Sequence, residues 1–151
     1  MKLSKFLESQ GTYVGIKVDE ASKQELIQLQ KTLRLQNPLD PDDFHVTVLF
    51  SRKQIDVPTV DTTFVATVEQ IDCWKTQDGK HAVVAKMTCP ELVERHEDLI
   101  SIGGTHDYPD YQPHVTLSYD DVITPMFVNA EVRLVDEYIE PLDLNWVANN
   151  D

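Results

Sequence analysis

The residues best suited to chemistry lie in two short His-x-Thr motifs. One stands in the segment FHVTVLF at residues 44–50, and the other stands in PHVTLSY at residues 113–119. The candidate catalytic residues are His45 and Thr47 in the first motif and His114 and Thr116 in the second. Because histidine titrates near neutral pH, one imidazole of the pair can be neutral while the other is protonated. Such a pair can take a proton from an attacking oxygen and give a proton to a departing one.

The threonines stand on the same strand faces as the histidines. Side chains alternate along a strand, so His45 and Thr47 share one face while the apolar residues of the motif pack on the other. A phosphate between the two motifs would receive hydroxyl hydrogen bonds on its non-bridging oxygens, where charge gathers in the transition state. Neither motif offers a carboxylate on this face, and a zinc site normally needs three or more protein ligands. The sequence therefore predicts no metal and no cofactor, and a catalytic metal is the alternative.

A wider internal repeat surrounds the motifs. His45 and His114 are 69 positions apart, and shifting the chain by this offset also aligns the flanking strand and helix patterns. Each half then reads strand, helix, loop, strand, over residues 12–51 and 81–120. A repeat of this kind within a single domain of residues 1–151 predicts two lobes related by a pseudo-twofold axis, with the motifs facing each other across a groove. The alternative is that two similar strands arose by chance.

Hydrophobic periodicity places the other elements. Besides the motif strands, strands are expected at residues 12–19, 63–74, 81–88 and 127–140. A capping box at Ser22 and Glu25 opens a helix that ends before Pro38, and a second helix begins near Pro90. These elements predict an α+β domain of two pseudo-twofold-related lobes of antiparallel sheet, with helices packed outside and a central groove.

The composition suits one soluble domain with a small anionic ligand. The chain has 151 residues and a formal net charge of -13. An acidic surface repels long nucleic acid, whose affinity comes largely from neutralised phosphates, whereas a few local cations can hold a small anion. The alternative is that the charge serves only solubility. No apolar run approaches the ~20 residues that span a bilayer, so no membrane partner is expected.

The two cysteines indicate a reducing compartment. Cys73 and Cys89 match no zinc pattern. Asp78-Gly79 is the strongest hairpin signal in the chain, and a two-residue turn there would place Cys73 opposite Val84, away from Cys89. Thiols misplaced for a disulfide fit the cytosol, so the chain is expected to be cytoplasmic.

Residues near the groove are candidates for holding a ligand. Tyr13 faces the groove by strand alternation and can stack on a base, a contact that contributes about 1 to 3 kcal/mol. Lys17 and Lys86 are equivalent under the repeat and can offset phosphate charge, although an exposed lysine is commonly only solvated. Residues 103–112 form either a flap over the ligand or a plain surface loop.

The paired motifs on a duplicated strand-helix-strand unit resemble the 2H phosphoesterase superfamily, which includes RNA 2′,3′-cyclic phosphodiesterases. The resemblance covers residues of about 12–140. Within the superfamily, the short acidic chain is most similar to the anti-CBASS phosphodiesterases of tailed phages, which destroy the cyclic oligonucleotide messengers of bacterial immunity. This resemblance implies two further ligand residues. Trp146 would cover a base, and Glu140 would accept hydrogen bonds from a base edge, against the alternatives of core filling and a solvated position.

Three functions follow from the motifs and the resemblance together. The first is a metal-independent phosphodiesterase that opens cyclic di- or trinucleotides such as cGAMP at 3′-5′ linkages, in the host bacterial cytoplasm. The second is an RNA 2′,3′-cyclic phosphodiesterase, and the third is a non-catalytic protein that sequesters cyclic nucleotides. In the first case the nucleophile is either the 2′-hydroxyl of the substrate or water. Which histidine is the base, the ring size, the preferred base and the oligomeric state are left open.

Overall fold

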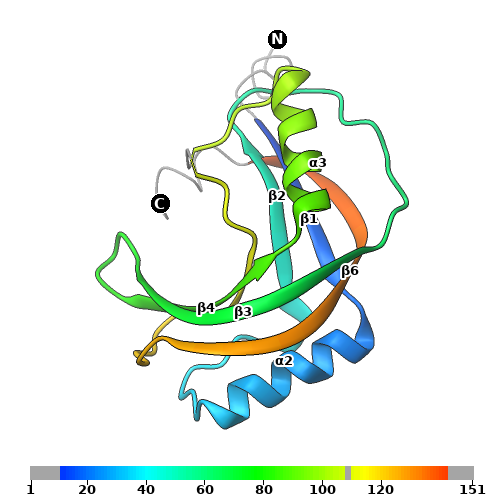
Figure 1. Ribbon diagram of the computed structural model, residues 1–151. Coiled ribbons are helices and arrows are strands. Elements are labelled where there is room, and N and C mark those ends of the chain that lie inside the picture. Colours follow the sequence, from blue (N-terminus) through cyan, green and yellow to red (C-terminus); the bar gives the residue numbers. More distant parts are fainter. Residues whose placement is uncertain (1–10, 108–109, 143–151) are drawn as a thin grey trace.

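Within residues 11–107 and 110–142, which the computed structural model describes, six strands form one antiparallel sheet (Figure 1). The strand order is β2-β1-β6-β3-β4-β5. The strands are β1 (Gly11–Val18), β2 (His45–Ser51), β3 (Phe64–Lys75), β4 (His81–Thr88), β5 (His114–Ser118) and β6 (Met126–Leu142). The helices are α2 (Glu20–Thr32), α3 (Pro90–Ser101) and the short 3-10 helix η1 (Pro41–Asp43). The predicted α+β class and antiparallel sheet are confirmed.

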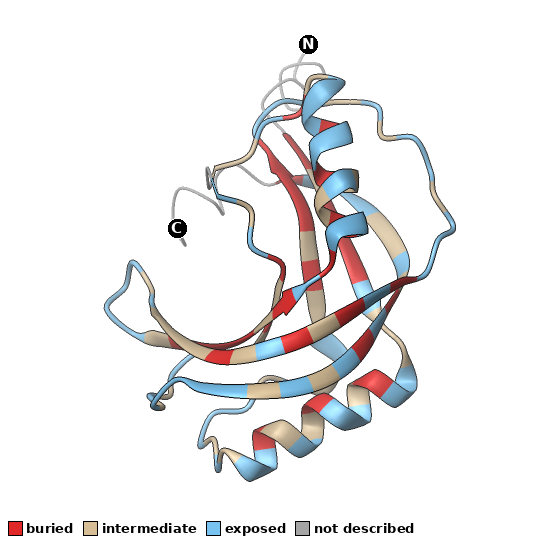
Figure 2. Ribbon diagram, in the orientation of Figure 1, coloured by how far each residue is buried: buried red, intermediate tan, exposed pale blue. Residues whose placement is uncertain are grey.

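The sheet is strongly curved, and a helix packs against each of two strands (Figure 1). Helix α2 contacts β6, and helix α3 contacts β2. Buried residues alternate with more exposed ones along β3, as a strand with one packed face requires (Figure 2). The fully buried core includes Val14, Ile16, Val46, Ala85 and Leu134. No helix among the described residues is long and apolar enough to cross a membrane.

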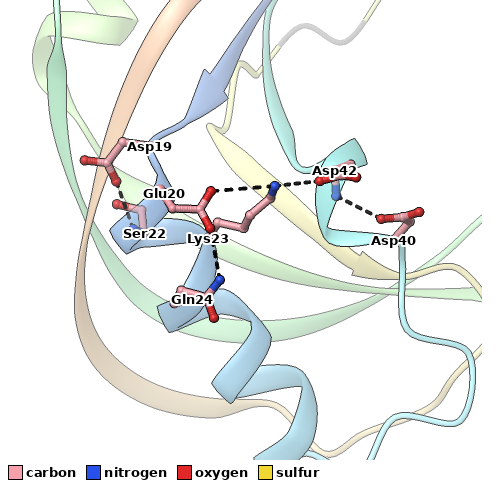
Figure 3. Close-up of polar contacts among 7 residues, drawn as sticks. All are labelled: Asp19, Glu20, Ser22, Lys23, Gln24, Asp40 and Asp42. Carbon is pink, nitrogen blue, oxygen red and sulfur yellow. Dashed lines mark hydrogen bonds and ion pairs between the residues drawn. The ribbon is translucent and has the colours of Figure 1, made fainter.

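The start of α2 differs from the predicted capping box. The N-cap is Asp19, whose side chain accepts a hydrogen bond from the backbone N–H of Ser22 at 2.8 Å (Figure 3). Ser22 lies inside the helix and is 4% exposed. Its hydroxyl accepts from the backbone N–H of Arg133 at 2.7 Å, which ties the helix to β6. The carboxylate of Asp19 therefore takes the capping role, because the serine is used in a tertiary contact.

The hairpin between β3 and β4 has a longer loop than the predicted two-residue turn. Residues 76–80 form the loop, whose end residues are joined by a backbone hydrogen bond of 2.8 Å. Asp78 in its centre accepts a hydrogen bond from the backbone N–H of Lys80 at 3.1 Å. The strand register consequently moves by one, so that Cys73 lies opposite Val83. Both cysteines are free thiols, as the sequence predicts.

The two motif strands pair with their neighbours in matching register. Lys17 lies opposite His45 on β1 and β2, and Lys86 lies opposite His114 on β4 and β5. The threonines match too. In each half, the residue opposite the motif threonine stands two positions before the lysine in the sequence. This correspondence supports our proposal that residues 12–51 and 81–120 are two repeated lobes of one domain.

Each motif strand carries an extra residue directly after its threonine. Val48 has no partner on β1, and Leu117 has no partner on β4. A β-bulge of this kind exchanges the two faces of the strand beyond it. Phe50 therefore packs with Tyr13 and Leu142 instead of in the main core, and Tyr119, predicted to pack inside, is 53% exposed.

Candidate active site

The two motif histidines have equivalent hydrogen bonds. Nδ1 of His45 lies 2.8 Å from the carbonyl oxygen of Asp43, and Nδ1 of His114 lies 2.8 Å from that of Gln112. A carbonyl oxygen only accepts hydrogen bonds, so each Nδ1 carries a proton and donates it. In the neutral ring Nε2 is then the nitrogen without a proton. Each ring therefore has its Nε2 available for proton transfer.

The environment of His114 favours its neutral form. Burial lowers the pKa of His114 below its usual value; the hydrogen bond to Gln112 opposes this shift, and positive charge on His45 lowers the pKa further. The ring of Trp74 packs edge-on against His114, with 4.6 Å between ring centroids. Its indole N–H donates to Asp72 at 3.0 Å, which fixes the tryptophan beside the histidine.

Tyr13 lies beside the first motif, where strand alternation places it. Its hydroxyl is 2.9 Å from Oγ1 of Thr47, and its ring stands edge-on to His45 with 6.4 Å between centroids. Burial raises the pKa of Tyr13 well above its usual range, although the hydrogen bond with Thr47 opposes this shift. The phenol therefore stays protonated and orients the threonine hydroxyl. Thr116 lies opposite Val84 in β4, on the strand face of Lys86.

A hollow of about 530 Å³ adjoins the first motif. Its lining includes Lys17, Asp43, His45, Tyr119, Tyr138 and Glu140. Nζ of Lys17 lies 5.8 Å from the ring centre of Tyr138, a cation–π contact. The structure therefore brings Lys17 and Glu140 together at His45. Tyr138 is missing from the sequence prediction, although its spacing of two from Glu140 on one strand was a usable signal.

The remaining predicted ligand residues lie elsewhere. Lys86 lines a different hollow, of about 640 Å³, between the start of α3 and residues 111–113. The two lysines are therefore not brought together. Trp146 lies outside the described residues. Trp74, whose place in the hairpin indicates a packing role, packs against a motif histidine.

Polar contacts hold the loop that precedes the first motif (Figure 3). Asp40 caps η1 by accepting from the backbone N–H of Asp42 at 3.0 Å. Nζ of Lys23 on α2 lies 2.6 Å from the Asp42 carboxylate. These contacts position the carbonyl of Asp43, which in turn holds His45. Because water screens an exposed ion pair of this type, the contact orders the loop more than it stabilises the fold.

Within residues 11–107 and 110–142, no group of three or more His, Cys, Asp or Glu side chains is arranged to hold a metal ion. The prediction that the reaction uses no metal remains a prediction. It rests on the chemistry of the donor set, because two imidazoles and hydroxyl groups are a complete apparatus for proton transfer.

Residues 103–112 are tied to β2 along their described part. Oγ1 of Thr105 accepts from the backbone N–H of Arg52 at 3.0 Å. Arg52 also forms a two-pronged ion pair with Asp107, with both N–O distances 2.9 Å. Nδ1 of His106 accepts from the backbone N–H of Phe50 at 3.1 Å. The segment is thus a packed support for the motif strand.

The stability of the protein is expected to fall in mild acid because of His106. Burial, followed by positive charge on His96, lowers the pKa of His106 from 6.5 to about 4, while Asp107 opposes the shift. Between these pH values the unfolded chain binds a proton that the folded chain does not. The free energy of unfolding is therefore expected to drop by about 1 to 2 kcal/mol as pH falls through this window, allowing for solvent screening.

Urea unfolding at pH 7, 5 and 4 would measure this loss. His106→Gln retains an acceptor for Phe50 but cannot bind the proton, so its free energy of unfolding should change less with pH. His81→Gln is the matched control and should keep the wild-type slope. An equal slope in wild type and His106→Gln would contradict the expectation.

Comparison with known proteins identifies a family that the chain matches over most of its length. A family model described as "Anti-CBASS protein Acb1" matches residues 10–149. The protein of that name from Vibrio phage KVP40 is 91% identical over 151 residues, covering 100% of both chains. The one from Enterobacteria phage T4 is 37% identical over 143 residues, covering 91% of this chain and 92% of the relative.

Solved structures share the fold. TT0787 of Thermus thermophilus aligns with a TM-score of 0.59 at 16% identity, covering 87% of this chain and 94% of its own. E. coli LigT complexed with 3′-AMP aligns with a TM-score of 0.51 at 14% identity, covering 89% and 95%. The fold expected from the 2H phosphoesterase resemblance is confirmed. On the family match and the identities to the phage proteins, the chain belongs to the anti-CBASS protein Acb1 family.

Proposed function

We propose that the protein is a phosphodiesterase that cleaves the 3′-5′ linkages of cyclic di- or trinucleotide messengers and so defeats CBASS immunity in the cytoplasm of an infected bacterium. The observation that carries this proposal is the equivalent hydrogen bonding of the two motif imidazoles, each with Nδ1 donating to a carbonyl and Nε2 available for proton transfer. Membership of a family named for opposing CBASS supplies the biological context. The hollow at His45 provides room for the ligand.

His114 is assigned as the base and His45 as the acid. Burial of His114 favours a neutral ring, and a proton on His45 strengthens that preference. Nε2 of His114 takes the proton of the ribose 2′-hydroxyl as that oxygen attacks the adjacent phosphorus. The bond from phosphorus to the 5′-oxygen breaks, and His45 gives that oxygen its proton. A linear product with a 2′,3′-cyclic phosphate forms. Water can then open this cyclic phosphate, with His45 acting as the base and His114 as the acid.

Thr47 and Thr116 are proposed to stabilise the phosphorane-like transition state. Hydroxyl donors aimed at the non-bridging oxygens interact most strongly when charge develops there. Tyr13 holds the hydroxyl of Thr47 at 2.9 Å, so this donor is oriented before substrate arrives. Lys17, beside His45 in the same hollow, offsets the negative charge of the phosphate.

Base recognition is assigned to the hollow and its surroundings. Tyr13 and Tyr138 lie with 6.1 Å between ring centroids, and together they offer an aromatic surface for stacking. Glu140 lines the same hollow and can accept hydrogen bonds from an exocyclic amine. Lys86, which lies opposite His114, remains a candidate for offsetting phosphate charge because the repeat makes it equivalent to Lys17. Trp146 remains a candidate for covering a base because the family resemblance implies that role.

An assay with excess chelator tests the proposed function. The purified protein is incubated with a panel of cyclic di- and trinucleotides and with RNA carrying 2′,3′-cyclic ends, and the products are resolved by chromatography. Linear products from the cyclic messengers are expected. Conversion of RNA ends alone would favour an RNA-end phosphodiesterase, retention without conversion would favour sequestration, and activity restored only by a divalent cation would contradict the metal-independent route.

A further inference from the structure

Both motif strands lie at the edges of the sheet and carry a bulge after the threonine. β2 and β5 are the first and last strands in the sheet order. The bulge residues are Val48 and Leu117, and they are separated by the same 69 positions as the motif histidines. Carbonyl groups of buried edge strands need partners from outside the sheet ladder. The partners of these two carbonyls are buried side chains from the helices.

Helix α3 supplies the partner for β2. Nδ1 of His96 lies 2.6 Å from the carbonyl oxygen of Val48, and the histidine is 7% exposed. Because a carbonyl only accepts, His96 is the donor. The ring of Tyr111 stacks on His96 with 4.0 Å between centroids, and the Tyr111 hydroxyl donates to the carbonyl of Thr47 at 2.6 Å. Two consecutive carbonyls of the first motif are thus held from outside the sheet.

Helix α2 supplies the partner for β5. Nε2 of Gln30 donates to the carbonyl of Leu117 at 3.0 Å and to that of Leu39 at 2.9 Å. Gln30 is 6% exposed. The backbone N–H of Leu39 donates to the same Leu117 carbonyl at 2.8 Å. The second motif is thus held from outside the sheet as the first one is.

The two contacts cross between the repeated halves. Helix α2 precedes β2 in the chain, but its Gln30 binds β5; helix α3 precedes β5, but its His96 binds β2. Figure 1 shows α3 running along β2, in agreement with their contacts. Each half of the repeat therefore anchors the motif strand of the other half.

We infer that His96 and Gln30 are positioning residues, His96 for His45 and Thr47, and Gln30 for His114 and Thr116. The kinetic part of this inference rests on the proposed function. Removing the His96 donor leaves the buried Val48 carbonyl without this hydrogen bond and so lowers stability, whereas the Leu117 carbonyl still accepts from the N–H of Leu39 when Gln30 is replaced. A displacement of about 1 Å at reacting groups can cost on the order of 10²-fold in rate. The anchors therefore act on the rate in variants that stay folded, in addition to their effect on stability.

The test uses near-isosteric variants that lack the donor. His96→Phe and Gln30→Met should each lower kcat by about 10- to 100-fold with KM changed by less than about 3-fold, because the reacting groups and not the ligand hollow are displaced. His96→Gln, which retains an N–H donor, should recover part of the loss. Gln24→Met, an exposed position on α2, is the matched control and should keep wild-type kcat.

A crossed spectroscopic readout separates positioning from general loosening. In NMR spectra of the full chain, His96→Phe should shift the imidazole signals of His45 and leave those of His114, whereas Gln30→Met should do the reverse. Tyr111→Phe, which removes only a hydroxyl, should reproduce the pattern of His96→Phe if the larger substitution fails to fold. Equal shifts of both motif histidines, or no shift in folded variants, would overturn the inference. This readout needs no turnover, so it decides the inference even if the wild type cleaves no cyclic nucleotide.

Discussion

Replacing either motif histidine with alanine is expected to reduce kcat for cyclic dinucleotide cleavage by about 10²- to 10⁴-fold. His45→Ala removes the proposed acid and His114→Ala the proposed base, and each ring is half-buried and lies outside the hydrophobic core. Initial rates at saturating substrate measure the loss. His81→Ala is the matched control, because this histidine lies outside both motifs and should leave kcat unchanged. Thermal unfolding of each variant verifies that the fold is retained.

The pH dependence of kcat/KM checks the assignment of roles. A base must be unprotonated in the free enzyme, so the acid limb of the profile is expected below about pH 6.5, the ordinary pKa of histidine, in keeping with the lowered pKa of His114. His45→Ala should retain this acid limb at a reduced rate, whereas His114→Ala should lose it. Full activity in either alanine variant would end the two-histidine mechanism, and loss of the acid limb in His45→Ala would reverse the roles.

A substrate without the 2′-hydroxyl at the scissile nucleotide is expected to resist cleavage. In the proposed mechanism that hydroxyl is the nucleophile, held next to the phosphorus by the ribose itself. Positioned groups of this kind correspond to effective concentrations of about 10⁵ to 10⁸ M, so no other oxygen in the site can replace it at a comparable rate. Product formation by chromatography over extended incubation measures the effect.

A cyclic dinucleotide with one deoxyribose contains its own control. Only the linkage that follows the intact ribose should be cut, giving a single linear product that carries its phosphate on that ribose. Cleavage at both linkages with similar rates would show that water is the nucleophile. In that case the histidines would retain their proton-transfer roles, and only the identity of the attacking oxygen would change.

Local alternation was sufficient to predict which residues lie beside each motif histidine. Tyr13 and Thr47 meet because each stands on the polar face of its own strand, and the repeat offset correctly paired Lys17 with Lys86 as neighbours of the motif histidines. Alternation failed beyond the bulges, since one unpaired residue reverses every later side chain. It therefore places Phe50 on the wrong face.

Contacts between distant segments could not be read from local patterns. Trp74 reaches a motif histidine because β3 and β5 both pair with β4, a proximity fixed by sheet order. Tyr138 depends likewise on the pairing of β6 with β1. Gln30 and His96 are polar residues in amphipathic helices, where a polar residue predicts solvent exposure. Their burial follows from carbonyl groups that only the folded sheet presents.

A strand at the rim of a sheet can pair with a strand of a second molecule, and repeated pairing of this kind begins a fibre. On β2 the backbone groups of Thr47, Val48 and Phe50 are occupied by side chains of the same molecule. A neighbouring chain would have to displace a tyrosine and two histidines before it could add a strand there. The bonds that support the first motif thus also oppose aggregation along this rim.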